Sequence, residues 1–332
     1  MNLQERIGIL AALGNYCQSS DPALLAAKRR AHAENGWFIP EFIDLALSQI
    51  VTEFLQKDKL QAWADRYAIP ASNPSPKNIG LIMAGNIPLV GFHDFLSIFI
   101  SGHRQTIKPS SRDESLFRHL IDHLISLKPE LGSLVSFAER LNGCDAYIAT
   151  GSNNSARYFE YYFSKYPHII RRNRTSTAVL EGSESPEELS LLADDVYQYF
   201  GLGCRNVTKL YVPAGYDFVP LLETFKKYDQ LEYLAKYKNN YDYQLTLLIL
   251  NKKFYMSTPS ILLTESPSPF SPISLLHYEY YQPAHSPIPA LKTNPDIQAI
   301  VGHGQIPFGQ AQRPTLTDYA DGVDTLDFLT KL

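Results

Sequence analysis

The feature that most constrains the fold of this chain is an alternation of short apolar runs with helical segments between residues 78 and 163. The runs at 78–83, 104–108 and 145–149 each have the length of a buried strand, and each is followed by a turn and then by a segment with helical spacing. Strands and helices that alternate in this way form a parallel sheet covered by helices. The sequence therefore predicts a doubly wound α/β domain in this region.

Helical spacing dominates the chain before this region, and a second α/β unit is predicted after it. Apolar residues recur at helical intervals from Leu3 to Leu55, and a stretch rich in proline and serine, 70–76, follows. Ser185 and Pro186 are typical of the start of a helix, which we expect to end at Gly201. Further strands are expected at 177–180, 209–212, 245–250 and 297–301.

These elements predict an α/β protein with two doubly wound domains and an N-terminal helical segment. The helical segment and its linker cover 1–76, the first α/β domain covers 77–184, and the second, which carries Cys204, covers 185–302. We expect the tail, 303–332, to pack back on the first domain or on a partner subunit.

Composition excludes several classes of protein. The 332 residues are 45% hydrophobic and 19% charged, which is typical of a globular protein with a large core. A net charge of -4 gives no general attraction to nucleic acid or to an anionic membrane. The most apolar stretch, 79–100, is interrupted by polar residues and proline, so we expect no membrane span, and the N-terminus lacks a signal-peptide pattern.

The cysteines indicate a reducing compartment. Cys17, Cys144 and Cys204 are too few and too scattered for a disulfide framework, and no C-x-x-C pair suggests zinc. We therefore expect a cytoplasmic protein without a metal site.

Turns that follow the first strands are candidate ligand sites. They are the segments 84–88, 108–111 and 150–155, and ligands of open parallel sheets bind at the carboxyl ends of the strands. The third turn offers a glycine, small hydroxyl groups and a helix N-terminus, which suit a pyrophosphate. The G-x-G-x-x-G fingerprint is absent, and each turn taken alone is better explained as a helix cap.

Cys204 is the candidate nucleophile. It lies close after Gly201 and Gly203, in a loop between a predicted helix and a predicted strand. Glycines let backbone N–H groups approach a bound carbonyl group, and the neighbouring Arg205 favours a thiolate. The alternative is that Cys204, like most free cysteines, is a small buried hydrophobic residue.

The order of these motifs resembles the aldehyde dehydrogenase superfamily. It is most similar to the acyl-CoA reductase branch, which includes the fatty acyl-CoA reductase of bacterial luminescence. The likeness covers about residues 77–325, and its order is specific as a set although no single motif is. The segments that carry it are 82–89, 102–111, 150–152, 201–204 with 210–212, and 309–324.

The resemblance implies a role for individual residues. Cys204 would be the nucleophile, and the Asn86 side chain would help the Cys204 N–H to form an oxyanion hole. The first α/β domain would bind a nicotinamide dinucleotide and the second would be catalytic. Lys108 would lie at the adenosine ribose, with Ser110 in the same turn. Gly151 and Ser152 would lie near the pyrophosphate.

Two departures from the superfamily pattern bear on the reaction. Arg171 or Arg172 takes the place of the glutamate that activates water in the hydrolytic members. An acyl group on Cys204 should therefore resist water. Ser268 takes the place of the glutamate in the Glu-x-Phe-Gly-Pro segment, and Glu265 is the nearby candidate to replace it at the cofactor. The chain is also shorter than typical members, so the dimer-forming arms should be reduced.

The resemblance implies an NADPH-dependent reductase that converts a fatty acyl-CoA, or another acyl thioester, to an aldehyde through an acyl-cysteine. NADPH is expected over NADH because Arg104, Lys108 and Arg112 cluster near the ribose turn. His93 and His277 are candidate proton donors, with a structural role as the alternative. The candidate protein partners are a second copy of the chain or an acyl-donor protein.

Two alternatives from other classes stay open. One is a cofactor-free acyltransferase that uses the same cysteine, and the other is a non-catalytic protein that binds acyl-CoA.

Overall fold

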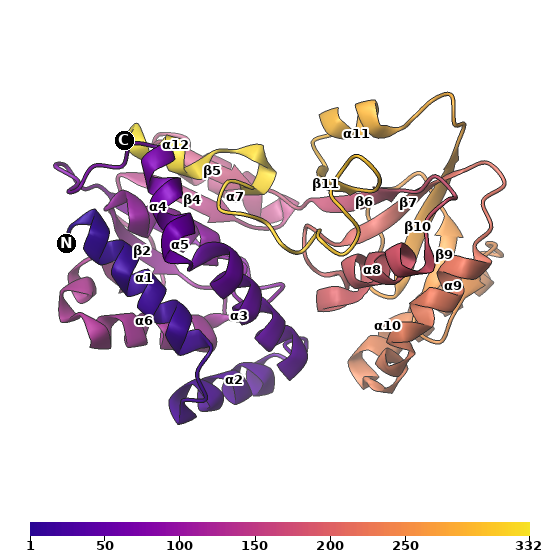
Figure 1. Cartoon of the computed structure of the whole chain (residues 1–332), viewed down its shortest axis with the longest axis horizontal. Helices are drawn as coiled ribbons and strands as arrows, with labels where there is room; N and C mark the ends of the chain where they lie inside the picture. The colour runs from indigo at the N-terminus through magenta and orange to yellow at the C-terminus, as the bar shows by residue number, and fades with distance from the viewer. The chain divides into compact units, whose positions relative to one another are not determined.

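The computed structural model describes all residues from Met1 to Leu332, and it divides into two compact units. Unit 1 contains residues 1–173 and 314–332, and unit 2 contains residues 174–313 (Figure 1). Each unit is built around its own, largely parallel sheet.

Unit 1 contains a five-stranded parallel sheet in the order β3-β2-β1-β4-β5. Its strands are β1 (Asn78–Ile82), β2 (Arg104–Lys108), β3 (Val135–Phe137), β4 (Ala146–Thr150) and β5 (His168–Arg171). The chain moves outward from β1 to β3 and then returns to the other side of β1, which is the doubly wound pattern. The sheet therefore has a switch point between β1 and β4, where ligands of such folds bind.

Helices form two layers on one face of this sheet. Crossovers between parallel strands are right-handed, so α5 (Phe92–Ser101) and α6 (Glu114–Leu127) share a face, and α7 (Asn153–Phe163) lies on the other. The N-terminal helices pack on α5 and α6 as an outer layer. They are α1 (Leu3–Cys17), α2 (Pro22–Glu34), α3 (Pro40–Phe54) and α4 (Lys57–Arg66).

Unit 2 contains a six-stranded sheet in the order β11-β6-β7-β10-β9-β8, parallel except for the short edge strand β8. Its strands are β6 (Thr175–Val179), β7 (Val207–Pro213), β8 (Met256–Ser257), β9 (Leu262–Glu265), β10 (Leu275–Tyr281) and β11 (Ile297–Val301). Its helices are α8 (Pro186–Tyr197), α9 (Val219–Phe225), α10 (Ala235–Leu250) and α11 (Ile288–Thr293). Both units are α/β, as the sequence predicted.

One predicted strand is wrong. The run 245–250 forms the last turns of α10 and not a strand. A short apolar run fits a buried strand and a buried helix equally well. Here Tyr237, Tyr241 and Leu248 are the buried positions of α10, and their spacing is helical.

The chain enters unit 2 earlier than the predicted domain boundary at 185. β6 pairs with β7 and β11, so it belongs to the second sheet and not to the first. The end of the tail returns to unit 1, where α12 (Thr325–Thr330) packs against α5. The Nε1–H of Trp63 donates to the Tyr319 hydroxyl at 2.9 Å and fixes this return.

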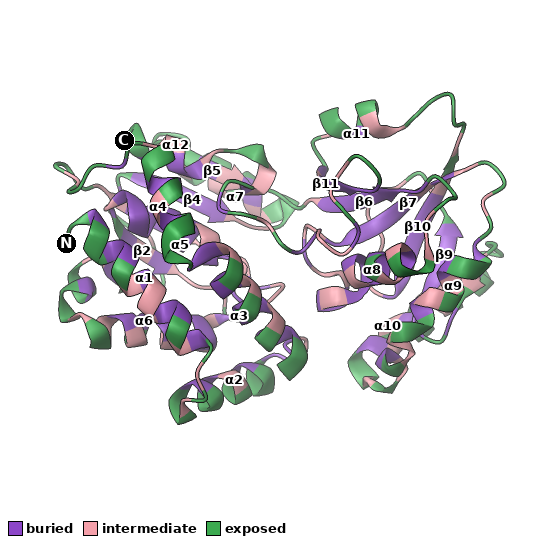
Figure 2. Cartoon of the chain, viewed as in Figure 1, coloured by how far each residue is buried: buried purple, intermediate pink, exposed green.

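Buried residues concentrate on the strands and on the inner sides of the helices (Figure 2). The three central residues of β1 are buried, and all five of β6 are. None of the helices has both the length and the apolar character that a membrane span needs.

Candidate active site

Cys204 follows a strained turn in unit 2. Helix α8 ends at Tyr197, and a single 3-10 turn, Gln198–Gly201, leads to the cysteine. Tyr199, Phe200 and Gly201 have φ angles of 53°, 58° and 74°. Bulky residues rarely adopt this left-handed conformation, and each costs about 1–3 kcal/mol unless its surroundings enforce it. Strain of this kind concentrates at functional sites.

Hydrogen bonds fix the peptide groups on both sides of Cys204. The Gly203 N–H donates to Asn206 Oδ1 at 2.8 Å, and the Gly203 carbonyl accepts the Asn206 N–H at 3.1 Å. The Ser176 hydroxyl donates to the Cys204 carbonyl at 3.0 Å. Arg205, which was expected beside the thiol, donates to the Ala311 carbonyl at 3.4 Å.

Cys204 differs from the other cysteines in exposure. It is half-buried, whereas Cys17 and Cys144 are buried. Burial raises the pKa of Cys17 to about 12 and also raises the pKa of Cys144, so both remain protonated thiols at neutral pH. No cluster of three or more metal-ligating side chains occurs in the structure.

In unit 1 the turns that carry Asn86 and Lys108 lie side by side. Ile82 and Lys108 are register partners at the ends of β1 and β2, and the Met83 N–H donates to the Lys108 carbonyl at 3.1 Å. A side chain at Gly85 would place its Cβ 2.6 Å from Ser110 Cβ, so only glycine allows this approach. Asn86, Lys108 and Ser110 therefore belong to one cluster.

Asp113 ties these turns together. Its Oδ2 accepts the Leu89 N–H at 2.7 Å, and Leu89 has a φ of 57°. Burial raises the pKa of the Asp113 carboxyl group well above its usual value, and its Oδ1 has no hydrogen-bond partner. The left-handed residue of the Asn86 turn is thus held by a carboxyl group from the next turn.

The third turn, with Gly151 and Ser152, lies beside the Asn86 turn because β4 neighbours β1 on the side opposite to β2. Ser152 is the N-cap of α7, and its hydroxyl accepts the Ser155 N–H at 3.3 Å. A Cβ at Gly151 would lie 2.9 Å from the Ser155 Cβ, so this glycine allows close packing against its own helix. The capping alternative therefore holds for Ser152 whether or not a ligand binds.

Glu265 is not brought to the Cys204 loop. It pairs with Tyr278, which pairs with Leu210 in the middle of β7. Two strand spacings, about 10 Å, and half of β7 separate Glu265 from the residues before Val207. Glu265 instead lines a hollow of about 600 Å³ with Phe254.

Arg171 or Arg172 was predicted to take the place of the glutamate that activates water in hydrolytic aldehyde dehydrogenases. Arg171 is buried and forms an ion pair with Asp94 and a hydrogen bond with the Thr325 hydroxyl at 2.7 Å. Arg172 is exposed and pairs with Glu160. Neither can accept a proton from water at neutral pH.

Both candidate histidines have structural contacts. His93 Nε2 lies 3.1 Å from the Leu316 carbonyl, and the His93 ring packs against Trp63. His277 Nδ1 lies 3.0 Å from the Ser268 carbonyl, and burial lowers the His277 pKa. The neutral form is therefore favoured for His277.

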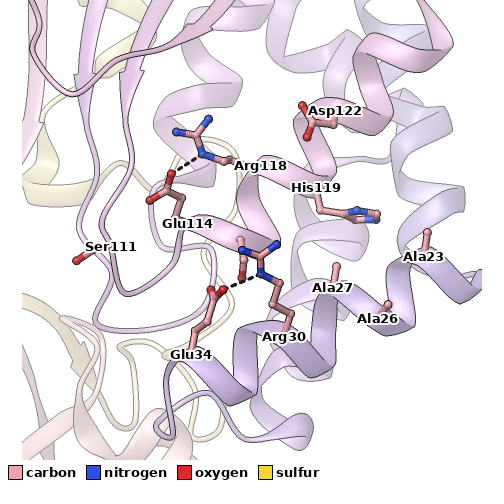
Figure 3. Close-up of a pocket in the computed structure, with 11 residues that line it drawn as sticks. Ala23, Ala26, Ala27, Arg30, Glu34, Ser111, Glu114, Arg118, His119 and Asp122 are labelled. Carbon is pink, nitrogen blue, oxygen red and sulfur yellow. Dashed lines mark hydrogen bonds and ion pairs between the residues drawn. The ribbon is translucent and has the colours of Figure 1, made fainter.

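A polar groove of about 690 Å³ lies between α2 and α6 (Figure 3). Ser111, three residues after Lys108, is one of the residues that line it. Four of its charged side chains form ion pairs along their own helices, Arg30 with Glu34 and Arg118 with Glu114. Of the predicted ligand-site turns only Ser111 lines this groove, and neither Lys108 nor Ser110 does.

Solved structures show which fold this is. Aldehyde dehydrogenase 21 from Physcomitrella patens, in complex with the reaction product succinate, has a TM-score of 0.65 at 12% identity; the match covers 91% of this chain and 74% of that one. The NAD+ complex of the aldehyde dehydrogenase from Bacillus cereus has a TM-score of 0.63 at 12% identity, covering 91% and 72%. The chain has the aldehyde dehydrogenase fold. No family model and no curated protein matches the sequence.

Apo betaine aldehyde dehydrogenase from Staphylococcus aureus shares the fold too, with a TM-score of 0.61 at 9% identity over 91% of this chain and 71% of that chain. At such identities the likeness concerns the aldehyde dehydrogenase fold alone. The predicted fold class is therefore confirmed, whereas the roles of the site residues and the acyl-CoA reductase branch stay predictions.

Sequence reasoning missed two residues that shape the sites of this aldehyde dehydrogenase fold. Asn206 holds the Cys204 loop, and Asp113 holds the Asn86 turn. Asn206 lies only two positions after the cysteine, so its place in a polar stretch was a usable signal. Asp113 had none, because its partner Leu89 belongs to a different turn.

Proposed function

We propose that the protein reduces a fatty acyl-CoA thioester to the aldehyde with NADPH, through an acyl-cysteine on Cys204. The observation that carries the proposal is the loop of Cys204. The other two cysteines are buried, whereas Cys204 is half-buried and follows a strained turn whose peptide groups are held on both sides. A reactive thiol needs such access and such a fixed setting.

The first step forms a bond between the Cys204 sulfur and the thioester carbonyl carbon. Negative charge develops on the carbonyl oxygen, and the Cys204 N–H and the Asn86 amide are the proposed donors to it. Removing one donor of this kind typically costs about 3–4 kcal/mol of transition-state stabilisation. The carbon–sulfur bond to CoA then breaks, and CoA leaves as the thiolate.

The residues of unit 1 fit a nicotinamide dinucleotide. Three polar turns meet at the carboxyl edge of the sheet on both sides of the switch between β1 and β4, the usual place for such a ligand. Lys108 and Ser110 would hold the ribose, and Gly151 and Ser152 the pyrophosphate. When bound, the cofactor supplies the hydride that reduces the acyl group.

Release of the product returns the cysteine. Breaking the carbon–sulfur bond of the reduced adduct gives the aldehyde and returns the Cys204 thiolate, the form that attacks in the first step. Arg112 is an exposed cation just after the Lys108 turn and supports a preference for a 2′-phosphate. Arg104 begins β2 and lies at the opposite end of that strand from Lys108, so the prediction that it clusters near the ribose turn is wrong. The ratio of kcat/KM for NADPH and NADH measures that preference.

The arginines that replace the hydrolytic glutamate support reduction rather than hydrolysis. With Arg171 in a buried ion pair and Arg172 in a surface pair, neither side chain can activate water against the acyl-cysteine. The acyl group is then kept for the hydride.

The test follows NADPH absorbance with octanoyl-CoA and palmitoyl-CoA, with aldehyde identified by trapping. We expect oxidation by the wild type and by Cys144→Ala, and a loss of at least about 1000-fold in Cys204→Ala, because the nucleophile is gone. Aldehyde formation by Cys204→Ala at the wild-type rate would refute the mechanism.

A cofactor-free acyltransferase is the second candidate. It is favoured because no carboxylate is in place to contact the nicotinamide cofactor. Ser268 stands where the superfamily has its glutamate, and its hydroxyl donates to the Phe270 carbonyl within its own turn. Glu265, the candidate replacement, is not near the Cys204 loop. A thermal shift with NADPH separates the candidates. The reductase requires stabilisation by the cofactor, whereas the acyltransferase and a non-catalytic acyl-CoA-binding protein do not. Acylation of Cys204 separates these last two.

A further inference from the structure

We propose that Asn206 is a positioning residue that sets the direction of the Cys204 N–H. The assignment rests on the proposed function, in which this N–H stabilises the oxyanion. It concerns a side chain that does not touch the reacting atoms and acts through the peptide groups around the cysteine.

The Asn206 amide joins both ends of the strained turn. Its Nδ2 donates to the Gln198 carbonyl at 2.7 Å, immediately before the left-handed residues, and to the Asp195 carbonyl at 3.1 Å. Its Oδ1 accepts the Gly203 N–H, immediately before Cys204. One buried side chain therefore spans the turn from the end of α8 to the cysteine, and supplies donors that helix-end carbonyls need.

The same residue fixes the peptide plane between Gly203 and Cys204. The carbonyl of that peptide accepts the Asn206 backbone N–H at 3.1 Å. A trans peptide is planar, so its N–H points opposite to its carbonyl. The Cys204 N–H is therefore directed away from Asn206, and the side-chain bond to the Gly203 N–H keeps the preceding peptide from rotating.

The alternative is that Asn206 only stabilises the fold. Both roles predict a lower melting temperature when the amide is removed. Only the positioning role predicts that a folded Asn206 variant acylates Cys204 more slowly. Only this role also predicts that, when an aspartate replaces Asn206, the loss depends on whether that aspartate is protonated.

The experiment measures acylation of the protein by octanoyl-CoA without cofactor, by intact mass, from pH 5.5 to 8. Asn206→Ala removes every side-chain bond, and we expect its rate, corrected for the folded fraction, to fall about 100-fold. Asn206→Asp keeps an oxygen that accepts the Gly203 N–H. Its ionised carboxylate, however, places a negative charge against the carbonyl oxygens of Asp195 and Gln198. Burial there raises the aspartate pKa, and the protonated acid regains a donor.

We therefore expect the ratio of the Asn206→Asp rate to the wild-type rate to rise as the pH falls, by up to about tenfold per unit. The Asn206→Ala ratio should stay level. Asn251→Ala is the matched control, because Asn251 also donates its amide to a helix-end carbonyl, Leu247 at 2.7 Å, and should leave the rate unchanged.

The outcomes are separable. Acylation of Asn206→Ala at the wild-type rate, or an Asn206→Asp ratio that does not change with pH, would overturn the positioning role and leave the proposed function intact. A folded wild type that forms no adduct would overturn the proposed function itself. If Asn206→Ala does not fold, the pH series of Asn206→Asp decides.

Discussion

At the scale of single residues, buried carboxyl groups shape both units. Asp195 lies in α8 with a side chain that is 1% exposed, and it accepts the N–H groups of Gly309 at 2.7 Å and Ala311 at 3.0 Å. These bonds hold the start of the tail against α8. Burial nevertheless dominates and raises the Asp195 pKa to about 7.

The raised pKa predicts a pH-dependent stability. Between about pH 4 and 7 the folded chain keeps a proton on Asp195 that the unfolded chain has lost, so the free energy of unfolding falls as the pH rises. One such group contributes up to about 1.4 kcal/mol per pH unit. We expect urea denaturation at pH 5, 6 and 7 to show that the free energy of unfolding falls with pH less steeply in Asp195→Asn than in the wild type. The difference between the two slopes should be about 1 kcal/mol per pH unit.

The control for this prediction is Asp242→Asn, which removes an exposed carboxylate that pairs with Lys238. Its slope should match that of the wild type. If the free energy of unfolding changes with pH equally in the wild type and in Asp195→Asn, Asp195 is ionised throughout this range and the prediction is wrong.

At the scale of elements, the loop 266–274 is the most specific feature of unit 2. It leaves the carboxyl end of β9 and returns to the start of β10, and side chains of the sheet hold its carbonyl groups. Thr208 donates to Pro269 at 2.6 Å, Lys209 donates to Pro267 at 2.9 Å, and His277 lies 3.0 Å from Ser268.

Lys209 is the strongest of these anchors, because its side chain is 0% exposed and also pairs with Glu279. Lys209→Met keeps the shape and removes the ammonium group. We expect a loss of about 1–2 kcal/mol in unfolding free energy, moderated by the partial exposure of Glu279, and faster hydrogen exchange at 266–271.

Lys253→Met is the matched control for that change, since Lys253 is exposed in the nearby hollow. It should alter neither stability nor exchange. Unchanged exchange in Lys209→Met would mean that the loop is held by its own turns.

The elements of unit 1 were more predictable than those of unit 2. Short runs between glycine- and proline-containing turns marked β1, β2 and β4 within a residue or two. The run 245–250 lacked such punctuation, so its apolar character was ambiguous. The sequence also could not predict which sheet β6 joins, because its pairing with β7 and β11 depends on residues far along the chain.

At the scale of the whole molecule, the order of motifs predicted more than any one of them. The fold was predictable from the βα alternation and the resemblance, although solved structures of that fold with which the chain was compared share only 9–13% identity with it. Cys204 and the Asn86 turn could be singled out because glycines and asparagine mark turns. Asp113 could not, because it acts through a contact with Leu89 that exists only after folding.

The proposed reaction depends on an acyl group that stays on Cys204 until it is reduced. The most direct measurement is a chase: the protein is acylated with octanoyl-CoA, freed of excess thioester, mapped by peptide mass, and then mixed with NADPH. We predict an adduct on Cys204 that persists in buffer and is released as octanal only after NADPH is added. Release of octanoate before NADPH is added, or an adduct on another residue, would contradict the account.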